Sequence, residues 1–235
     1  MTAIIEARDL VAGRRGVPAV RGLTLSVDAG EVVALLGPNG AGKTTTLLTL
    51  AGILPPISGD VRILGEGLPR RPRPHVLARR GLAFVPEGRG LFRQLTVAEN
   101  LRLARRGRGG DTREVLATFP ALAPLMRRRC GLLSGGEQQM LALAKALLAE
   151  PKAILLDEMS LGLAPVVVER LLPMVREIAT ERGIGVLIVE QHVRMALSIA
   201  DRAYVLNHGE LVLSGRAEDV REQRELLEAG YLGGP

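Results

Sequence analysis

A glycine-rich turn at residues 37–44 carries the residue types that hold a polyphosphate. It reads GPNGAGKT, matches G-x-x-x-x-G-K-[ST] at each fixed position, and lies between a predicted buried strand and a predicted helix. Glycines let backbone N–H groups turn toward phosphate oxygens, Lys43 reaches the outer phosphates, and the Thr44 hydroxyl is placed to bind Mg²⁺. A chance glycine-rich turn is the alternative. The predicted nucleotide-binding residues of this turn are Gly37, Pro38, Asn39, Gly40, Ala41, Gly42, Lys43, Thr44 and Thr45.

A pair of acidic residues, Asp157 and Glu158, ends the apolar run at residues 153–156. In a protein with such a phosphate-binding turn, the first carboxylate is placed to hold Mg²⁺ together with Thr44. The second carboxylate can act as general base for an attacking water. The alternative is that the pair only caps the next helix. We predict Glu158 and Lys43 as catalytic residues and Asp157 as a metal ligand.

The segment LSGGEQQMLALAKALL, residues 133–148, begins a predicted helix with glycines, which are poor helix residues. Ser134 and Glu137 fit a capping box, with Ser134 at the N-cap and Glu137 at N3. Capping alone does not require Gly135 and Gly136 between them. Glycines here leave the N–H groups and the positive end of the helix open to an anion. The pattern therefore predicts a second phosphate-binding turn, far in sequence from the first.

The elements that position these residues are predicted by hydrophobic periodicity. Strands are expected at residues 4–10, 23–27, 31–36, 61–64, 82–85, 153–156, 186–189, 204–206 and 211–213. Helices are expected at residues 43–51, 111–119, 193–200 and 217–229, and from Ser134 and Pro165 onward. Thr96 and Glu99 form a capping-box pattern that predicts a further helix from Thr96. The RRPRP stretch, residues 70–74, is the best candidate for an exposed loop. Strands alternate with helices at both ends of the chain, which predicts an α/β fold with crossover helices.

Composition limits the partners and the compartment. The net charge is +6, but only three of the 31 basic residues are lysines, and aromatic residues are 2% of the chain. The arginines are scattered without interleaved aromatic residues, so we expect no nucleic-acid partner; an anionic membrane surface or a protein partner stays open. The single cysteine, Cys130, fits a reducing compartment. No uncharged apolar run approaches the length of a membrane span, and the first residues lack a signal-peptide pattern, so we expect a soluble, cytoplasmic chain.

Taken together, GPNGAGKTT, LSGGEQQ and ILLDE resemble the ATP-binding cassette family over almost the whole chain. The resemblance implies ATP and Mg²⁺ as cofactors and an α/β fold with a P-loop NTPase (RecA-like) core, a parallel sheet, a small antiparallel β subdomain and an inserted α-helical subdomain. It divides a single domain, residues 1–235, into a core at 1–87 and 152–235 and a helical subdomain at about 88–151. It also implies a head-to-tail dimer, in which the turn Ser134–Glu137 of one cassette contacts the ATP held by the P-loop of the other.

The same resemblance gives roles to further residues. Glu87, in VPEGRGLF, stands where the family usually has the Q-loop glutamine, which senses Mg²⁺ and couples to membrane subunits. His192, in VEQH, matches the histidine that contacts the γ-phosphate, and is counted here as catalytic; an ordinary surface histidine is the alternative. Arg14 replaces the family's adenine-stacking aromatic residue, and its guanidinium could stack on the base or point into solvent. Residues 160–164 occupy the loop that contacts the partner cassette.

More particular segments, VPEGRGLFRQLTVAENL, LLDEMSLGLAP and the terminal YLGG, resemble the LivF-type ATPases of branched-chain amino-acid importers. This implies a peripheral ATPase on the cytoplasmic face of the cell membrane. Its partners would be membrane permease subunits, a second cassette (a homodimer or a sister ATPase) and, indirectly, a substrate-binding protein. The alternatives are an ATPase for another substrate such as urea or amides, or a non-transport cassette. A GTP switch would need an N-K-x-D segment, which the sequence lacks, and a binding module without turnover would lack ATPase activity.

Overall fold

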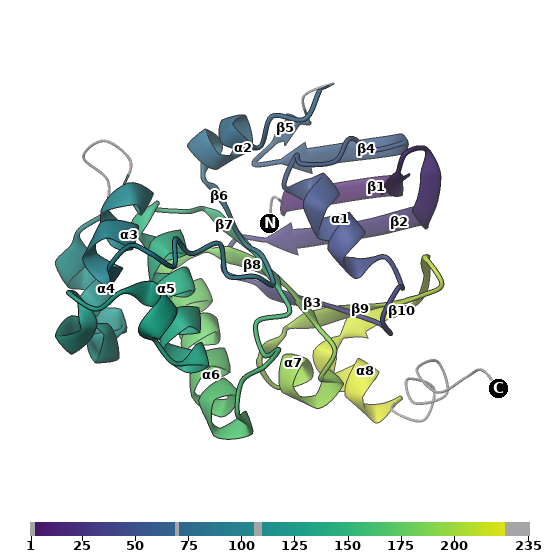
Figure 1. The fold of residues 1–235 in the computed structure, drawn as a ribbon. Helices are drawn as coiled ribbons and strands as arrows, with labels where there is room; N and C mark the ends of the chain where they lie inside the picture. Colours follow the sequence, from purple (N-terminus) through teal and green to yellow (C-terminus); the bar gives the residue numbers. More distant parts are fainter. Residues whose placement is uncertain (1–2, 69–70, 106–109, 224–235) are drawn as a thin grey trace.

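The computed structural model describes residues 3–68, 71–105 and 110–223 and contains two sheets (Figure 1). The smaller sheet is antiparallel, in the order β2-β1-β4-β5. The larger sheet has the order β10-β9-β3-β8-β7-β6, and it is parallel except for its edge strand β10. The strands are β1 (Ala3–Arg14), β2 (Val17–Asp28), β3 (Val32–Leu36), β4 (Ser58–Ile63), β5 (Glu66–Gly67), β6 (Leu82–Val85), β7 (Ala153–Asp157), β8 (Gly185–Glu190), β9 (Arg202–Asn207) and β10 (Glu210–Arg216).

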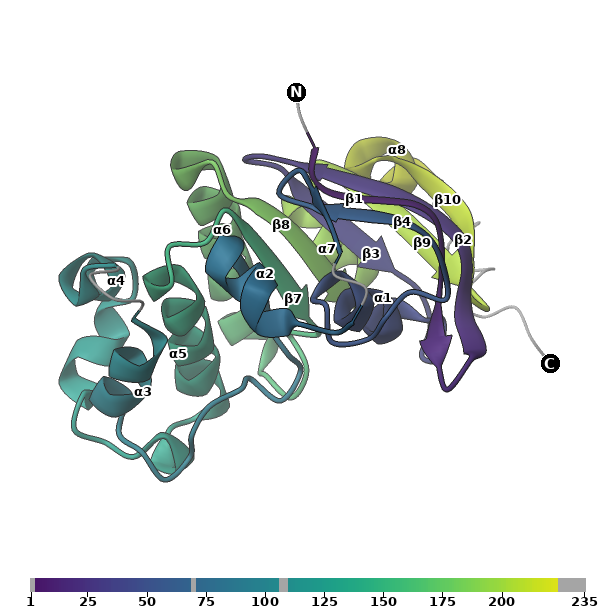
Figure 2. The same cartoon turned by 90° about the horizontal axis from the view of Figure 1, so that it is seen from above.

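Helices cover both faces of the larger sheet and extend to one side of it. They are α1 (Lys43–Leu50), α2 (Pro74–Arg80), α3 (Val97–Ala104), α4 (Thr112–Thr118), α5 (Gly135–Leu148), α6 (Pro165–Arg182), α7 (Val193–Ile199) and α8 (Ala217–Glu222), with the 3₁₀ turns η1 (Pro120–Leu125) and η2 (Cys130–Leu132). Seen from above, α3, α4 and α5 lie at one end of the molecule and the antiparallel sheet at the other (Figure 2). None of the described helices is long and apolar enough to cross a lipid bilayer.

The strand β3 divides the core, because successive side chains of a strand point to opposite faces. Val33 and Leu35 face a core shared with α1 and the antiparallel sheet. Val32, Ala34 and Leu36 face a core shared with α5, α6 and α7. All five residues of β3 are buried, which explains why this strand reads as a continuous apolar run rather than an alternating one.

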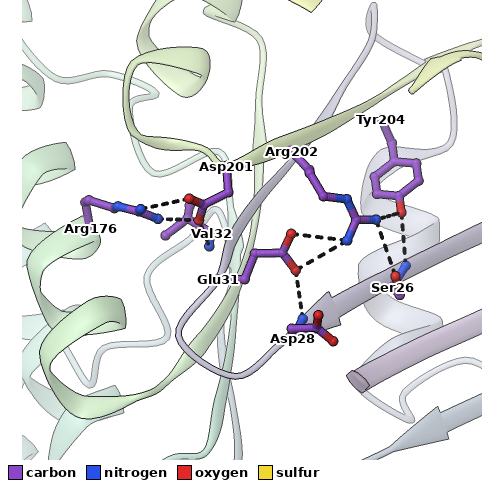
Figure 3. Close-up of polar contacts among 8 residues, drawn as sticks. All are labelled: Ser26, Asp28, Glu31, Val32, Arg176, Asp201, Arg202 and Tyr204. Carbon is purple, nitrogen blue, oxygen red and sulfur yellow. Dashed lines mark hydrogen bonds and ion pairs between the residues drawn. The ribbon is translucent and has the colours of Figure 1, made fainter. Parts of the chain in front are cut away.

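Two arginine–carboxylate pairs hold together the elements at the start of β3 (Figure 3). Arg176 of α6 donates to both carboxylate oxygens of Asp201, with Nη2 2.8 Å from Oδ1, and Asp201 Oδ2 also accepts the Val32 N–H at 2.9 Å. Arg202 of β9 donates to Glu31 Oε1 at 3.1 Å and to the Tyr204 hydroxyl. These contacts tie α6, β3 and β9 together at the edge of the sheet where β3 begins.

The structure confirms most of the predicted elements and corrects some boundaries. The strand at residues 82–85 is found as predicted, and both predicted capping boxes are present. Leu64 is not part of β4, because it adopts a positive φ of 54° in a turn. Pro74, expected in a loop, begins α2, where a proline is favoured because the first helical N–H has no partner within the helix. Part of the predicted helix at 217–229, Arg70 of the predicted loop, and YLGG lie outside the described residues.

Candidate nucleotide-binding and catalytic site

The phosphate-binding turn joins β3 to α1, as its sequence predicts. Gly42 has φ 100°, and a Cβ there would lie 2.4 Å from Val20 Cγ2 and 2.7 Å from Ala19 O. Gly37 has φ 152°, and its Cβ would lie 2.3 Å from Leu206 O. Because neither position has room for a side chain, the turn is held tightly between β2 and β9. Its path is therefore fixed by the neighbouring strands and not by the turn alone.

Lys43 is buried inside this turn and is only 4% exposed. Its Nζ donates to Gly37 O at 2.8 Å and to Pro38 O at 3.0 Å. Burial lowers the pKa of Lys43, while the nearby carboxylates of Glu158 and Asp157 oppose this shift. The Lys43 ammonium is therefore partly desolvated and paired with neutral carbonyl oxygens. Negatively charged phosphate oxygens would bind it more strongly than these carbonyls do.

The acidic pair lies next to this turn, across the sheet edge. The Thr44 hydroxyl donates to Asp157 Oδ1 at 3.4 Å, and Asp157 is 3% exposed. Burial raises the pKa of Asp157 to about 6; the negative charge of Glu158 adds to this shift, the hydrogen bond from Thr44 opposes it, and the charge of Glu87 contributes as well. The site therefore concentrates negative charge, which the positive charge of Lys43 partly opposes.

The donor set fits Mg²⁺ bound together with a polyphosphate. Thr44, Asp157 and Glu87 offer only oxygen ligands, which Mg²⁺ prefers. Within the described residues, no three His, Cys, Asp or Glu side chains stand close enough to hold a metal by themselves. Mg²⁺ is usually held by one or two carboxylates, and phosphates and waters complete its coordination shell. A few oxygen ligands from the protein, completed by the phosphates of a bound nucleotide, therefore suit Mg²⁺. A bound Mg²⁺ would favour the ionised carboxylate of Asp157 and so oppose the burial that raises its pKa.

Glu158 follows β7 in a left-handed conformation, with φ 46°. Its N–H donates to Val189 O at 3.0 Å, and its Oε2 accepts a hydrogen bond from Gln191 Nε2 at 2.8 Å. This conformation is uncommon for a residue other than glycine, and such strain is often found at functional sites. The contact with Gln191 orients the carboxylate without neutralising it, as a general base requires.

Sequence reasoning missed two residues of this edge, Glu190 and Gln191. Glu190, 1% exposed at the end of β8, accepts hydrogen bonds from Ser160 N at 3.0 Å and Ser160 Oγ at 2.5 Å. Burial raises the pKa of Glu190. Gln191 contacts Glu158 as described. His192, which the sequence predicted, follows them and is exposed at the N-cap of α7. The polar run EQH, residues 190–192, at the end of a buried strand could have predicted both residues, because the carboxyl ends of parallel strands meet at one edge of the sheet.

The turn Ser134–Glu137 begins α5 with both reciprocal hydrogen bonds of the capping box. Ser134 Oγ accepts from Glu137 N at 3.3 Å, and Glu137 Oε2 accepts from Ser134 N at 2.7 Å. Gly136 is buried, and a Cβ there would lie 2.7 Å from Val167 Cγ1, so its glycine also lets α6 approach. Ser134 is exposed, and its O–H stays available as a donor. Within the described chain, no hydrogen bond or ion pair joins this turn to the P-loop.

Arg14 is the last residue of β1 and is exposed, opposite Val17. It lines a groove of about 440 Å³ together with Gly13, Arg15, Gly16 and residues 54–57. The neighbouring pair Ala12–Val20 lies where β2 contacts Gly42 of the P-loop. Arg14 is thus near the P-loop along the hairpin, and its stacking on an adenine stays a prediction.

Comparisons with known proteins agree with this geometry. A family model described as "ABC transporter" matches residues 20–160. The chain is 41% identical to the high-affinity branched-chain amino acid transport ATP-binding protein BraG of Pseudomonas aeruginosa, over 93% of this chain and 94% of that protein. It is 35% identical to the lipopolysaccharide export system ATP-binding protein LptB of Escherichia coli K12, over 98% of both chains.

A solved structure gives the same result for the fold. The ADP conformation of an ATP-binding cassette of an ABC transporter matches with a TM-score of 0.84 and 25% identity, over 100% of both chains. This similarity confirms the predicted α/β fold, with its mainly parallel sheet and antiparallel subdomain.

The raised pKa of Asp157 makes a prediction about stability without nucleotide and Mg²⁺. The folded chain binds this proton more tightly than the unfolded chain, whose Asp pKa is 3.8, so the associated stability is lost as pH rises from about 4 to about 6. Ionised Asp157 should cost about 2–3 kcal/mol at neutral pH. Asp157→Asn should therefore increase the free energy of unfolding of the ligand-free chain near neutral pH, and the gain should shrink at about pH 4.

Urea unfolding at both pH values measures this difference. Asp60→Asn is the matched control, because Asp60 is in an exposed pair with Arg62 and should change stability by less than about 1 kcal/mol. An Asp157→Asn chain no more stable than the parent near neutral pH would contradict the electrostatic account of this site.

Proposed function

This chain belongs to the ABC transporter family and is an ATPase of that family, and we propose that it energises the uptake of branched-chain amino acids through partner membrane permeases. The observation that carries the proposal is the arrangement of P-loop, acidic pair and His192 at one sheet edge, together with the similarity to BraG. The sequence segments at residues 85–101 and 155–165 support the same branch of the family. The similarity to LptB keeps an ATPase for another substrate as the alternative.

The binding step uses the residues of the P-loop. Backbone N–H groups of residues 39–45 would surround the phosphates, and Lys43 would exchange its loop carbonyl partners for phosphate oxygens. Thr44 and Asp157 would hold Mg²⁺, with Glu87 nearby. The ion, when bound, supplies charge neutralisation at the β- and γ-phosphates. Arg14 would lie against the adenine.

The hydrolytic step assigns proton transfer to Glu158. Its carboxylate, oriented by Gln191, accepts a proton from the water that attacks the γ-phosphorus, while the bond to the β-phosphate oxygen breaks. The proton then passes to the products, ADP and phosphate. His192, exposed on the same edge, would donate a hydrogen bond to the γ-phosphate and stabilise the charge that develops there.

The separation of Ser134–Glu137 from the P-loop within one chain supports a head-to-tail pair of cassettes. Each signature turn (Ser134, Gly135, Gly136 and Glu137) would contact the ATP of the other cassette, using the Ser134 hydroxyl and the positive end of α5. The second cassette is a sister ATPase or a second copy. Hydrolysis removes the shared γ-phosphate contact and lets the pair open.

Transport requires that this closure reaches the membrane subunits. We propose that residues of about 88–151 move as a helical subdomain relative to the core, residues 1–87 and 152–235, and that the Glu87 loop transmits the movement. The chain would sit at the cytoplasmic face of the membrane as a peripheral subunit, with a substrate-binding protein as an indirect partner and no nucleic acid.

The catalytic proposal predicts the behaviour of Glu158→Gln. The amide keeps the contact with Gln191 but cannot accept the proton, so the hydrolysis rate should fall by at least about 100-fold while ATP binding persists. The variant should accumulate as an ATP-dependent dimer, measured by size-exclusion chromatography with light scattering. Glu150→Gln, an exposed control, should hydrolyse ATP at the parental rate. Parental turnover in Glu158→Gln would remove Glu158 from its role.

The transport proposal predicts a substrate-specific defect in cells. A strain that lacks this chain should lose high-affinity uptake of labelled leucine, isoleucine and valine, and the wild-type gene but not Glu158→Gln should restore it. Urea uptake and lipopolysaccharide export, measured in the same strain, test the alternatives. Normal uptake of the three amino acids, with a defect in either other process, would overturn the substrate assignment but not the ATPase assignment.

A further inference from the structure

Arg89 lies in the loop between β6 and α3, two residues after Glu87. It has a positive φ of 64°, and its N–H donates to Pro86 O at 2.7 Å, so residues 86–89 form a tight turn that contains Glu87. Arginine rarely adopts this conformation, because its Cβ crowds the backbone. The contacts of its side chain therefore need an explanation.

The Arg89 side chain reaches the first turns of α5. Its Nη1 donates to Gln138 Oε1 at 2.7 Å, and its Nε donates to Gln139 Oε1 at 3.2 Å. Both glutamines are buried, with exposures of 8% and 3%. A planar group with several N–H donors is needed here, because a single side chain contacts two neighbouring amides at the same time, and only arginine carries such a group.

The orientation of Gln138 is fixed independently of Arg89. Its Nε2 donates to Cys130 O at 3.2 Å and to Leu133 O at 3.0 Å, which holds its oxygen toward the guanidinium. Leu133 is the residue before Ser134. Arg89 thus connects, through one side chain, the Glu87 turn to the backbone that leads into the signature turn.

The charge of Arg89 is not compensated within the described chain. No carboxylate forms an ion pair with it there, and burial and the charge of Arg93 both lower its pKa. Its Nη2 would lie 3.5 Å from a Cβ on Gly135, so it stands beside the positive end of α5. This placement is unfavourable in the single chain and becomes favourable when an anion approaches the turn.

We propose that Arg89 is a positioning residue that fixes the signature turn, residues 134–137, to the Glu87 turn and so sets it for the ATP held by the partner cassette. The proposal rests on the function proposed above. With this link, a displacement of the Glu87 turn moves the start of α5 with it. Without the link, Glu87 can move while the signature turn stays misaligned.

The test measures dimer formation in the Glu158→Gln background. Arg89→Ala in this background should raise the ATP concentration for half-maximal dimerisation about tenfold or more, because two charge-assisted hydrogen bonds are lost in the subunit that presents the turn. Alanine has a similar backbone cost at a positive φ, so the change removes the side chain alone. The affinity of the monomer's own P-loop for ATP should stay near that of the parent.

Two further variants separate positioning from charge. Arg89→Lys keeps the charge but cannot hold two amides, so it should resemble Arg89→Ala; it also replaces Arg89→Ala if that variant does not fold. Arg93→Ala, the matched control, removes an exposed arginine of the same loop and should leave dimerisation unchanged.

The outcomes distinguish the two proposals. Arg89→Ala that dimerises at the ATP concentration of its parent, Arg89→Lys that restores full dimerisation, or Arg93→Ala with the same defect overturns the role of Arg89. A Glu158→Gln chain that binds ATP but never dimerises overturns instead the shared nucleotide site of the proposed function.

Discussion

The parallel pairing of β3, β8 and β7 is the constraint on which the site depends. Because the three strands are adjacent and run in one direction, their carboxyl ends bring the P-loop, residues 190–192 and the acidic pair to one edge. Every residue of β3, β7 and β8 is buried, so hydrophobic packing on both faces fixes this alignment. At the other end of β3, Asp201 of the ion pair with Arg176 accepts the backbone N–H of Val32 and fixes the start of the strand. The edge at the carboxyl ends of these strands can therefore carry backbone strain, as at Glu158, and uncompensated charge.

That edge is electrostatically incomplete without its ligands. Asp157 is buried beside Glu158, and Lys43 is curled into the loop that should hold phosphate. Polyphosphate and Mg²⁺ would satisfy both groups at once, since the phosphate takes Lys43 and the ion takes Asp157. The signature turn has the opposite deficit: a positive helix end with Arg89 beside it and no carboxylate paired to Arg89 in the described chain. Two cassettes placed head to tail would satisfy both deficits with one nucleotide, which is why the proposed function needs a pair.

The sequence predicted the features that depend on local chemistry. The P-loop, the acidic pair after β7 and the capping boxes at Thr96 and Ser134 are set by residues within a few positions of one another. The features that it missed depend on contacts between distant residues. Gln191 reaches Glu158 only because β7 and β8 are neighbours, and Arg89 reaches Gln138 across 49 residues. The helix α2 was missed because the prolines and arginines of residues 70–74 were interpreted as a loop, although a proline such as Pro74 is favoured in the first turn of a helix. Gly136 was expected only to leave the start of α5 open to an anion. In the structure, the lack of a Cβ at Gly136 also lets Val167 of α6 pack against it.

The central claim is that a complete nucleotide site needs two cassettes. The most direct measurement is the ATP hydrolysis rate per chain as a function of chain concentration, with the association state followed by analytical ultracentrifugation. The account predicts that the rate per chain rises with concentration and levels off where dimers predominate. A rate per chain that stays constant at dilutions where only monomers are present would contradict it.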